Sequence, residues 1–146
     1  MINFEKSLFI NRPQQEVFDY LSNPANDAQW QSSTEVSEWT SEGPPGVGST
    51  QRSVIKLLGR KIDSSLEVTT WDPPQQLGFK VVSGPIPFEG TIKLESQENG
   101  TQVSQTVQAE PGGFFKIAEG LVSKQIEKQI STDFDALKLQ LEAGQA

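Results

Sequence analysis

The chain has 146 residues, of which 12 are Lys or Arg and 19 are Asp or Glu, which gives a formal charge of −7, and it contains no His or Cys. The missing residue types exclude a Ser-His-Asp triad, an imidazole or thiolate metal site, a disulfide framework and a thiol nucleophile. The acidic balance argues against DNA or RNA as a partner. This length fits one domain, and we expect residues 1–146 to form it.

The start of the chain predicts two strands with two short helices between them. In residues 2–10 the apolar side chains mostly share one parity, as in a half-buried strand. Pro13 is suited to open a helix, because the first turn of a helix leaves its N–H groups unbonded in any case. A second short helix is expected within 24–33, around Trp30, and a strand within 36–40.

A hairpin is predicted over residues 51–68, because Gly59-Arg60 suits a two-residue turn with glycine in its first position. With this turn, opposite charges face each other on one side of the hairpin, in the pairs Lys56–Asp63 and Arg52–Glu67. The basic run 52–61 is therefore interpreted as a neutralised surface rather than as a site for an anionic partner. The other side of the hairpin carries most of its apolar residues.

A second hairpin is predicted at Asn99-Gly100, a pair typical of type I′ turns. Its register gives the inward-facing pairs Ile92–Val107 and Leu94–Gln105. Apolar alternation predicts a further strand at 77–81, which a turn at Gly84-Pro85 joins to Phe88.

From residue 114 onward the apolar residues recur with helical spacing, which predicts one long amphipathic helix. The predicted strands cannot bury their inward face alone, and this helix is the only predicted element large enough to cover it. The expected order is one strand, two short helices, six strands in a meander and the long helix.

This order resembles the START-like superfamily, which includes birch-pollen allergens, lipid-transfer START domains and bacterial polyketide cyclase/dehydrase proteins. The local sequence is similar to the bacterial branch. The matching stretches are INRPQQEVFDYL at 10–21, Trp30, GVGS at 46–49, Gly59-Arg60, VTTWDPP at 68–74, Gly100-Thr101 and the last amphipathic helix. The resemblance covers essentially the whole chain.

The resemblance implies an α+β helix-grip fold, in which a curved seven-stranded antiparallel sheet wraps around the long C-terminal helix and two short helices follow the first strand. Proteins of this superfamily typically bind apolar small molecules such as lipids, sterols or polyketides between sheet and helix, and some cyclise or dehydrate polyketides. The superfamily has no universal catalytic residue, so the resemblance assigns none to this chain.

Alternation along the predicted strands turns several small or polar side chains toward the interior. A filled core rarely tolerates such groups without hydrogen-bond partners. With apolar neighbours they are predicted to line a ligand cavity, and the alternative is that they bond to one another or to buried water. The first apolar turns of the long helix either cap this cavity or pack in the core. The predicted lining residues are Gln51, Ser53, Ile55, Ser64, Leu66, Thr70, Phe79, Val81, Phe88, Ile92, Gln105, Phe114, Ile117 and Leu121.

Three hypotheses of function follow. The first is a carrier of an apolar, lipid-like or polyketide-like small molecule. The second is an enzyme of the polyketide cyclase/dehydrase type, in which Lys6, Tyr20 or a carboxylate would move protons. The alternative for Lys6 is a bulge or a stem that carries its ammonium group to the edge of the sheet, the alternative for Tyr20 is packing on its helix, and the lack of His disfavours catalysis. The third is an interaction module in which the cavity is incidental.

The remaining expectations concern partners and location. The sequence contains no metal-ligand spacing and no cofactor motif, so we expect neither. It contains no apolar run long enough to cross a membrane, and residues 1–5 do not begin a basic and then apolar leader, so we expect a cytoplasmic protein without membrane insertion. Its oligomeric state is left open between monomer and homodimer.

Overall fold

The structure is a computed structural model that describes residues 2–110 and 119–144. Its elements are β1 (Ile2–Ile10), α1 (Gln14–Leu21), the short 3₁₀ helix η1 (Pro24–Asn26), α2 (Asp27–Trp30), β2 (Thr34–Trp39), β3 (Thr50–Leu57), β4 (Arg60–Asp72), β5 (Gln76–Ser83), β6 (Phe88–Gln97), β7 (Gly100–Ala109) and α4 (Glu119–Gly144). Apart from small shifts at the ends, these are the elements that the sequence predicts, and residues 114–118 of the predicted long helix lie outside the described residues.

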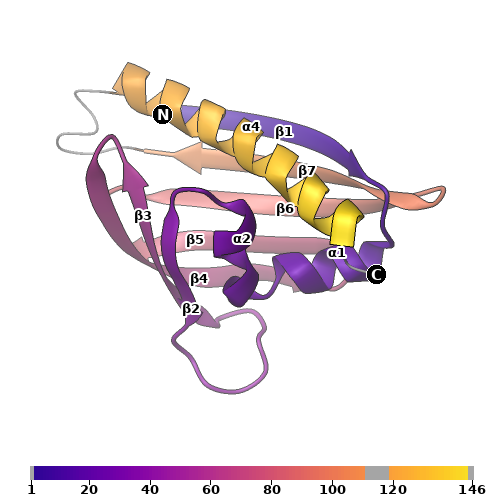
Figure 1. The fold of residues 1–146 in the computed structure, drawn as a ribbon. Coiled ribbons are helices and arrows are strands. Elements are labelled where there is room, and N and C mark those ends of the chain that lie inside the picture. The colour runs from indigo at the N-terminus through magenta and orange to yellow at the C-terminus, as the bar shows by residue number, and fades with distance from the viewer. Residues whose placement is uncertain (1, 111–118, 145–146) are drawn as a thin grey trace.

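The seven strands form one antiparallel sheet in the order β1-β7-β6-β5-β4-β3-β2. Strands β2 to β7 therefore follow the chain as a meander, and β1 returns to the edge beside β7. Figure 1 shows α4 lying across one face of this curved sheet, with α1 and α2 near its C-terminal half. The predicted α+β helix-grip fold is confirmed. A two-layer arrangement of this kind buries the apolar face of the sheet and the apolar stripe of the helix against each other.

The β3–β4 hairpin turns one residue earlier than the sequence predicts. Leu57 pairs with Arg60, so the turn residues are Leu58 and Gly59, with φ of 52° and 76°. Two positive φ angles match the twist of a type I′ hairpin, which a glycine in the second position tolerates. The predicted pairs Lys56–Asp63 and Arg52–Glu67 are therefore wrong.

The charges of this hairpin are still neutralised, through other partners. The Arg52 guanidinium donates two hydrogen bonds to the Asp63 carboxylate, at 2.8 and 3.1 Å. Glu35 on β2 lies 3.3 Å from Lys61 Nζ and 3.9 Å from Lys56 Nζ. Because the shift displaces each partner by two positions, every side chain stays on the face that the sequence predicts.

The β6–β7 hairpin shows the same kind of shift. Gln97 pairs with Gly100, so Glu98 and Asn99 form the turn and Glu98 has a φ of 50°. Ile92 consequently lies opposite Gln105 and Leu94 opposite Val103, rather than in the predicted pairs. The side chains of this hairpin again keep the faces that the sequence predicts, because each partner is displaced by two positions.

A β-bulge in β4 reverses parity near the end of that strand. The register shifts between Val68, which pairs with Phe79, and Thr70, which pairs with Gly78. One extra residue in a strand turns the following side chains to the opposite face. Trp71 therefore faces inward, whereas regular alternation from Val68 would turn it outward, and its ring lies 5.5 Å from the Phe18 ring in an edge-to-face contact.

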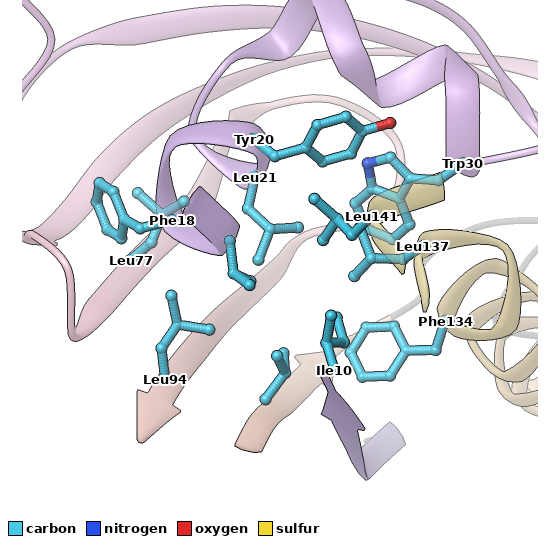
Figure 2. Close-up of a cluster of buried hydrophobic side chains, with 12 residues drawn as sticks. Ile10, Phe18, Tyr20, Leu21, Trp30, Leu77, Leu94, Phe134, Leu137 and Leu141 are labelled. Atoms are coloured by element: carbon cyan, nitrogen blue, oxygen red, sulfur yellow. The ribbon is translucent and has the colours of Figure 1, made fainter. Parts of the chain in front are cut away.

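Two separate clusters of buried side chains hold α4 on the sheet. The larger one joins the C-terminal half of α4 to α1, α2 and the strands, as Figure 2 shows, and consists of Ile10, Val17, Phe18, Tyr20, Leu21, Trp30, Leu77, Leu94, Val103, Phe134, Leu137 and Leu141. The smaller one lies at the N-terminal half of α4 and consists of Ile2, Leu57, Ile62, Ile86, Ala109 and Val122. The side chains of the two clusters do not fill the space between them.

Polar contacts fix the C-terminal end of α4 to the segment that joins β1 to α1. The Arg12 guanidinium donates to the carbonyl oxygens of Leu141 and Glu142, at 2.8 and 3.0 Å. A cation at this end of a helix also interacts favourably with the helix dipole. Lys138 Nζ donates to the carbonyl oxygen of Phe9 at 2.6 Å.

Gly100 is required by the close approach of β1 and β7. A Cβ at this position would overlap the Phe9 ring and lie 2.6 Å from the Ile10 carbonyl oxygen. We therefore expect Gly100→Ala to lower the free energy of unfolding by about 1–3 kcal/mol, as overpacking does. Urea unfolding followed by circular dichroism measures this loss.

The matched control for that substitution is Gly120→Ala on α4. A Cβ at Gly120 meets nothing within 4 Å, and alanine is the better helix former. Stability should stay the same or rise by up to about 1 kcal/mol. Equal losses in the two variants would contradict the steric explanation for Gly100.

Candidate ligand cavity

A cavity of about 290 Å³ lies between α4 and the sheet, in the space that separates the two core clusters. Its wall combines inward-facing residues of β2 to β7 with residues of α1, α2 and α4. The bordering residues are Leu21, Asp27, Trp30, Gln31, Ser33, Ser37, Gln51, Ser53, Ile55, Lys56, Leu57, Ile62, Ser64, Leu66, Phe79, Ile86, Phe88, Gly90, Ile92, Gln105, Val107, Ala109, Ile126, Gln129, Ile130, Asp133 and Phe134. Most of them are apolar, and the polar ones come mainly from α2, β3 and α4.

Most residues that the sequence predicts as lining lie on this wall. They are Gln51, Ser53, Ile55, Ser64, Leu66, Phe79, Phe88, Ile92 and Gln105. Gln51 and Ser64 are buried, and among the described residues neither side chain makes a hydrogen bond. Polar groups left unpaired in this way are costly in a filled core, whereas a cavity gives them room for water or a ligand.

The structure does not place every predicted residue on the wall. The bulge in β4 displaces Thr70 from it, and Val81 lies opposite Leu66 without bordering the cavity. Leu121 is 64% exposed, because Val122 occupies the buried position of that helical turn. Phe114 and Ile117 lie outside the described residues.

Lys6 and Tyr20, the candidate proton-transfer groups, do not border the cavity. Lys6 is half-buried in β1, opposite Gln105 on β7. The Tyr20 hydroxyl donates to Gln29 Oε1 at 2.9 Å, and burial raises the pKa of this phenol. Tyr20 lies in the larger core cluster and therefore has the packing role that the sequence left as its alternative.

Asp27 is a cavity residue that the sequence reasoning missed. It begins α2, and its Oδ2 atom accepts a hydrogen bond of 2.6 Å from Ser37 Oγ on β2. Burial raises the pKa of this carboxyl to about 6, and the hydrogen bond from Ser37 opposes the shift only in part. Asp27 lies three residues before the buried Trp30, so both are on the same face of a short helix. This spacing could have predicted the inward position of Asp27 from the sequence.

Asp133 is a second missed carboxyl, in the middle of α4. Its Oδ1 atom accepts hydrogen bonds from the Ser32 backbone N–H at 3.2 Å and from Gln129 Nε2 at 2.9 Å. Burial raises the pKa of this carboxyl too, against those hydrogen bonds. An acid that follows Ile126 and Ile130 at helical spacing interrupts an apolar stripe, and this irregularity marks the site in the sequence.

Comparison with known proteins places the chain in a family. Residues 1–142 match the model of the family described as polyketide cyclase / dehydrase and lipid transport. The chain belongs to this family. A search of curated proteins finds no match.

Several solved structures share the whole fold. A protein from Thermus thermophilus is 20% identical, with a TM-score of 0.85 and 99% of each chain covered. A START superfamily protein from Mycobacterium smegmatis is 12% identical, with a TM-score of 0.83 over 97% of this chain and 98% of the other. The ZhuI aromatase/cyclase from Streptomyces sp. R1128 is 15% identical, with a TM-score of 0.77 over 96% of this chain and 93% of the other. At these identities the likeness shows the fold alone.

The described residues contain neither a cluster of metal-binding groups nor a membrane-spanning helix. Among residues 2–110 and 119–144, no three carboxylates gather closely enough to hold a metal ion. No helix within the same ranges is long and apolar enough to cross a bilayer.

The raised pKa of Asp27 predicts a dependence of stability on pH. Between pH 3.8 and about 6 the folded protein keeps a proton that the unfolded chain has released, so the stabilisation from this group is lost as the pH rises through that window. Asp27→Asn, which stays neutral, should therefore be about 1–3 kcal/mol more stable than the wild type at pH 8, and this gain should vanish toward pH 4. Urea unfolding at both pH values measures it.

Asp63→Asn is the control, and its expected change in stability at pH 8 has the opposite sign. The Arg52 guanidinium lowers the pKa of Asp63, so this carboxylate contributes stability above its unfolded pKa and loses it as the pH falls. That variant should be less stable than the wild type at pH 8. If Asp27→Asn also lost stability at pH 8, the account of Asp27 would be wrong.

Proposed function

We propose that the protein binds and carries a small apolar molecule in the cavity between α4 and the sheet. The observation that supports this is a mostly apolar wall around about 290 Å³, with a few polar side chains that no described residue satisfies. Concave, largely apolar sites with a small number of polar groups are typical of small-molecule binding. Membership in a family described as including lipid transport agrees with it.

Binding in this cavity would be driven by removal of apolar surface from water. Burial of each CH₂ group contributes about 0.8 kcal/mol, so a chain of eight carbons gains about 6 kcal/mol before the costs of association. Gln51, Ser53 and Ser64 on β3 and β4 would orient the ligand through its polar groups.

Native mass spectrometry of the purified protein, followed by extraction with organic solvent, tests this function. We expect a bound apolar compound, or a rise in melting temperature with members of a library of alkyl and aromatic compounds. A melting temperature that no compound in the library changes, together with the absence of any co-purified molecule, would refute the proposal. A cytoplasmic location and a monomeric or homodimeric state stay predictions.

A second candidate function is catalysis of the polyketide cyclase/dehydrase type, which the position and pKa of Asp27 favour. A carboxyl with a pKa of about 6 is suited to take and return protons near neutral pH. In a cyclisation the Asp27 carboxylate would take the α-proton of a ketone, the enolate would form a C–C bond to a second carbonyl carbon, and the new alkoxide would recover the proton.

Incubation of the protein with a linear poly-β-ketone tests the enzyme hypothesis. Cyclised product should form with the wild type and with Asp63→Asn, and should fall by about 10²-fold or more with Asp27→Asn. Equal product with and without the protein would leave the carrier function as the only candidate.

A further inference from the structure

Two carboxyl groups border the cavity, and the described residues supply only neutral donors to them. Asp27 Oδ2 accepts from Ser37 Oγ, and Asp133 Oδ1 accepts from Ser32 and Gln129. Within the part of the chain that the structure describes, the second oxygen of each carboxyl accepts no hydrogen bond. Each group therefore presents one free acceptor in a largely apolar setting.

Gln51 adds an acceptor to the same part of the wall. Its side chain is 7% exposed, borders the cavity and makes no hydrogen bond to the described residues. Across β2 and β3, Ser53 lies opposite Ser37, the partner of Asp27. Gln51 lies two residues before Ser53 on the same face of β3, about 7 Å along the strand. Asp27 and Gln51 thus belong to one polar region of the cavity.

Among the described residues, no cationic side chain pairs with either carboxyl of this polar region. A carboxylate taken out of water without a cation is penalised, which is why burial raises the pKa of both aspartates. A cation placed beside Asp27 would remove much of that penalty. The cationic residue on the wall is Lys56, but its side chain is 61% exposed and its ammonium group lies 3.9 Å from Glu35.

We propose that the ligand of the cavity is an apolar molecule with a protonated amine, whose ammonium group binds the Asp27 carboxylate and whose body lies against the apolar wall. This inference rests on the proposed carrier function and names its ligand class. The amide oxygen of Gln51 accepts a second N–H of the ammonium group. The apolar part of the ligand extends between β6 and α4, along Phe88, Ile92 and Ile126.

Charged and titratable groups reach this region from each neighbouring element. Burial, and then the charge of Asp27, raise the pKa of the Tyr20 phenol on α1. Lys56 on β3 is paired with Glu35 on β2, and Asp133 lies on α4. Near pH 7 Tyr20 is neutral, and Asp27, with a pKa of about 6, carries a negative charge. Protonation of Asp27 in acid therefore weakens the binding of an amine and leaves that of an uncharged ligand unchanged.

Three probes with the same alkyl chain test the proposal on the full-length wild type: octylamine, octan-1-ol and octanoate, titrated calorimetrically at pH 7.5. We expect octylamine to bind at least about tenfold more tightly than either of the others, because it pairs with a buried carboxylate. At pH 5 its advantage over octan-1-ol should shrink. Equal binding of the amine and the alcohol would overturn the amine proposal and leave the carrier function standing, whereas failure of all three to bind would count against both.

Two matched variants locate the ammonium site. Asp27→Asn should bring the affinities for octylamine and octan-1-ol to within about twofold of each other and leave that for octan-1-ol unchanged. Asp133→Asn, which also alters a buried carboxyl on the wall, should keep the preference for the amine. If Asp133→Asn removes the preference and Asp27→Asn does not, the assignment to Asp27 is wrong. Far-ultraviolet circular dichroism of each variant confirms that it is folded.

Discussion

Replacement of Leu137 by alanine is expected to lower the free energy of unfolding by about 2–5 kcal/mol, because it deletes a fully buried side chain and leaves a void. Leu137 has no exposed surface and lies in the larger core cluster, between α4 and the strands (Figure 2). It does not border the cavity, so this loss of stability would come without a direct change to the ligand site. Urea unfolding at pH 7 measures the effect.

Leu139→Ala on the same helix is the matched control. Leu139 is 69% exposed, so the same chemical change should shift stability by less than about 0.5 kcal/mol. A loss at Leu137 no larger than that at Leu139 would show that the C-terminal half of α4 does not pack on the sheet as described.

A split core explains why so much of the stability depends on that half of α4. The larger cluster, which contains Leu137 and Phe134, gathers α1, α2 and α4 at one end of the molecule. Among the described residues the smaller cluster contains six buried side chains, and the cavity occupies the space between the two clusters. The modest apolar share of the chain, 34%, is consistent with an interior that is not completely filled.

Periodicity in the sequence was sufficient to predict the elements and the faces of the strands. The alternation in β3 and β4 placed Gln51, Ser53 and Ser64 on the inward face, where the structure also has them. Hairpin register was not predictable by the same means. The turn rules favour Gly or Asn at positive φ, whereas Leu58 and Glu98 adopt it here as part of turns set by the pairing of whole strands.

Parity also fails where the backbone departs from regular geometry. The bulge after Val68 turns Trp71 inward and removes Thr70 from the cavity wall, and nothing in the local sequence marks the extra residue. Asp27 and Asp133 were missed because the prediction followed strand faces, whereas these two carboxyls come from helices that close the cavity from the other side. Their importance depends on burial, which only the packed structure reveals.

Gly90→Phe is expected to abolish ligand binding, with at least about a tenfold loss of affinity, while the protein stays folded. Gly90 borders the cavity on β6, between the lining residues Phe88 and Ile92. A Cβ at this position would lie 3.4 Å from the Thr106 carbonyl oxygen, which is an ordinary contact, so the backbone accepts a side chain. Because alternate residues of a strand share a face, the phenyl ring would enter the cavity and occupy the space of the ligand.

Glu89→Phe is the control for an added aromatic ring on the same strand. Glu89 is exposed on the opposite face of β6, so its replacement should leave the affinity within about twofold of the wild type. Both variants are titrated with whichever apolar ligand the wild type binds, and their melting temperatures are measured. Together these measurements distinguish a cavity filled by the new ring from a variant that fails to fold. Retained affinity in a folded Gly90→Phe variant would show that the ligand binds elsewhere, because a ring at residue 90 and a ligand in about 290 Å³ compete for the same volume.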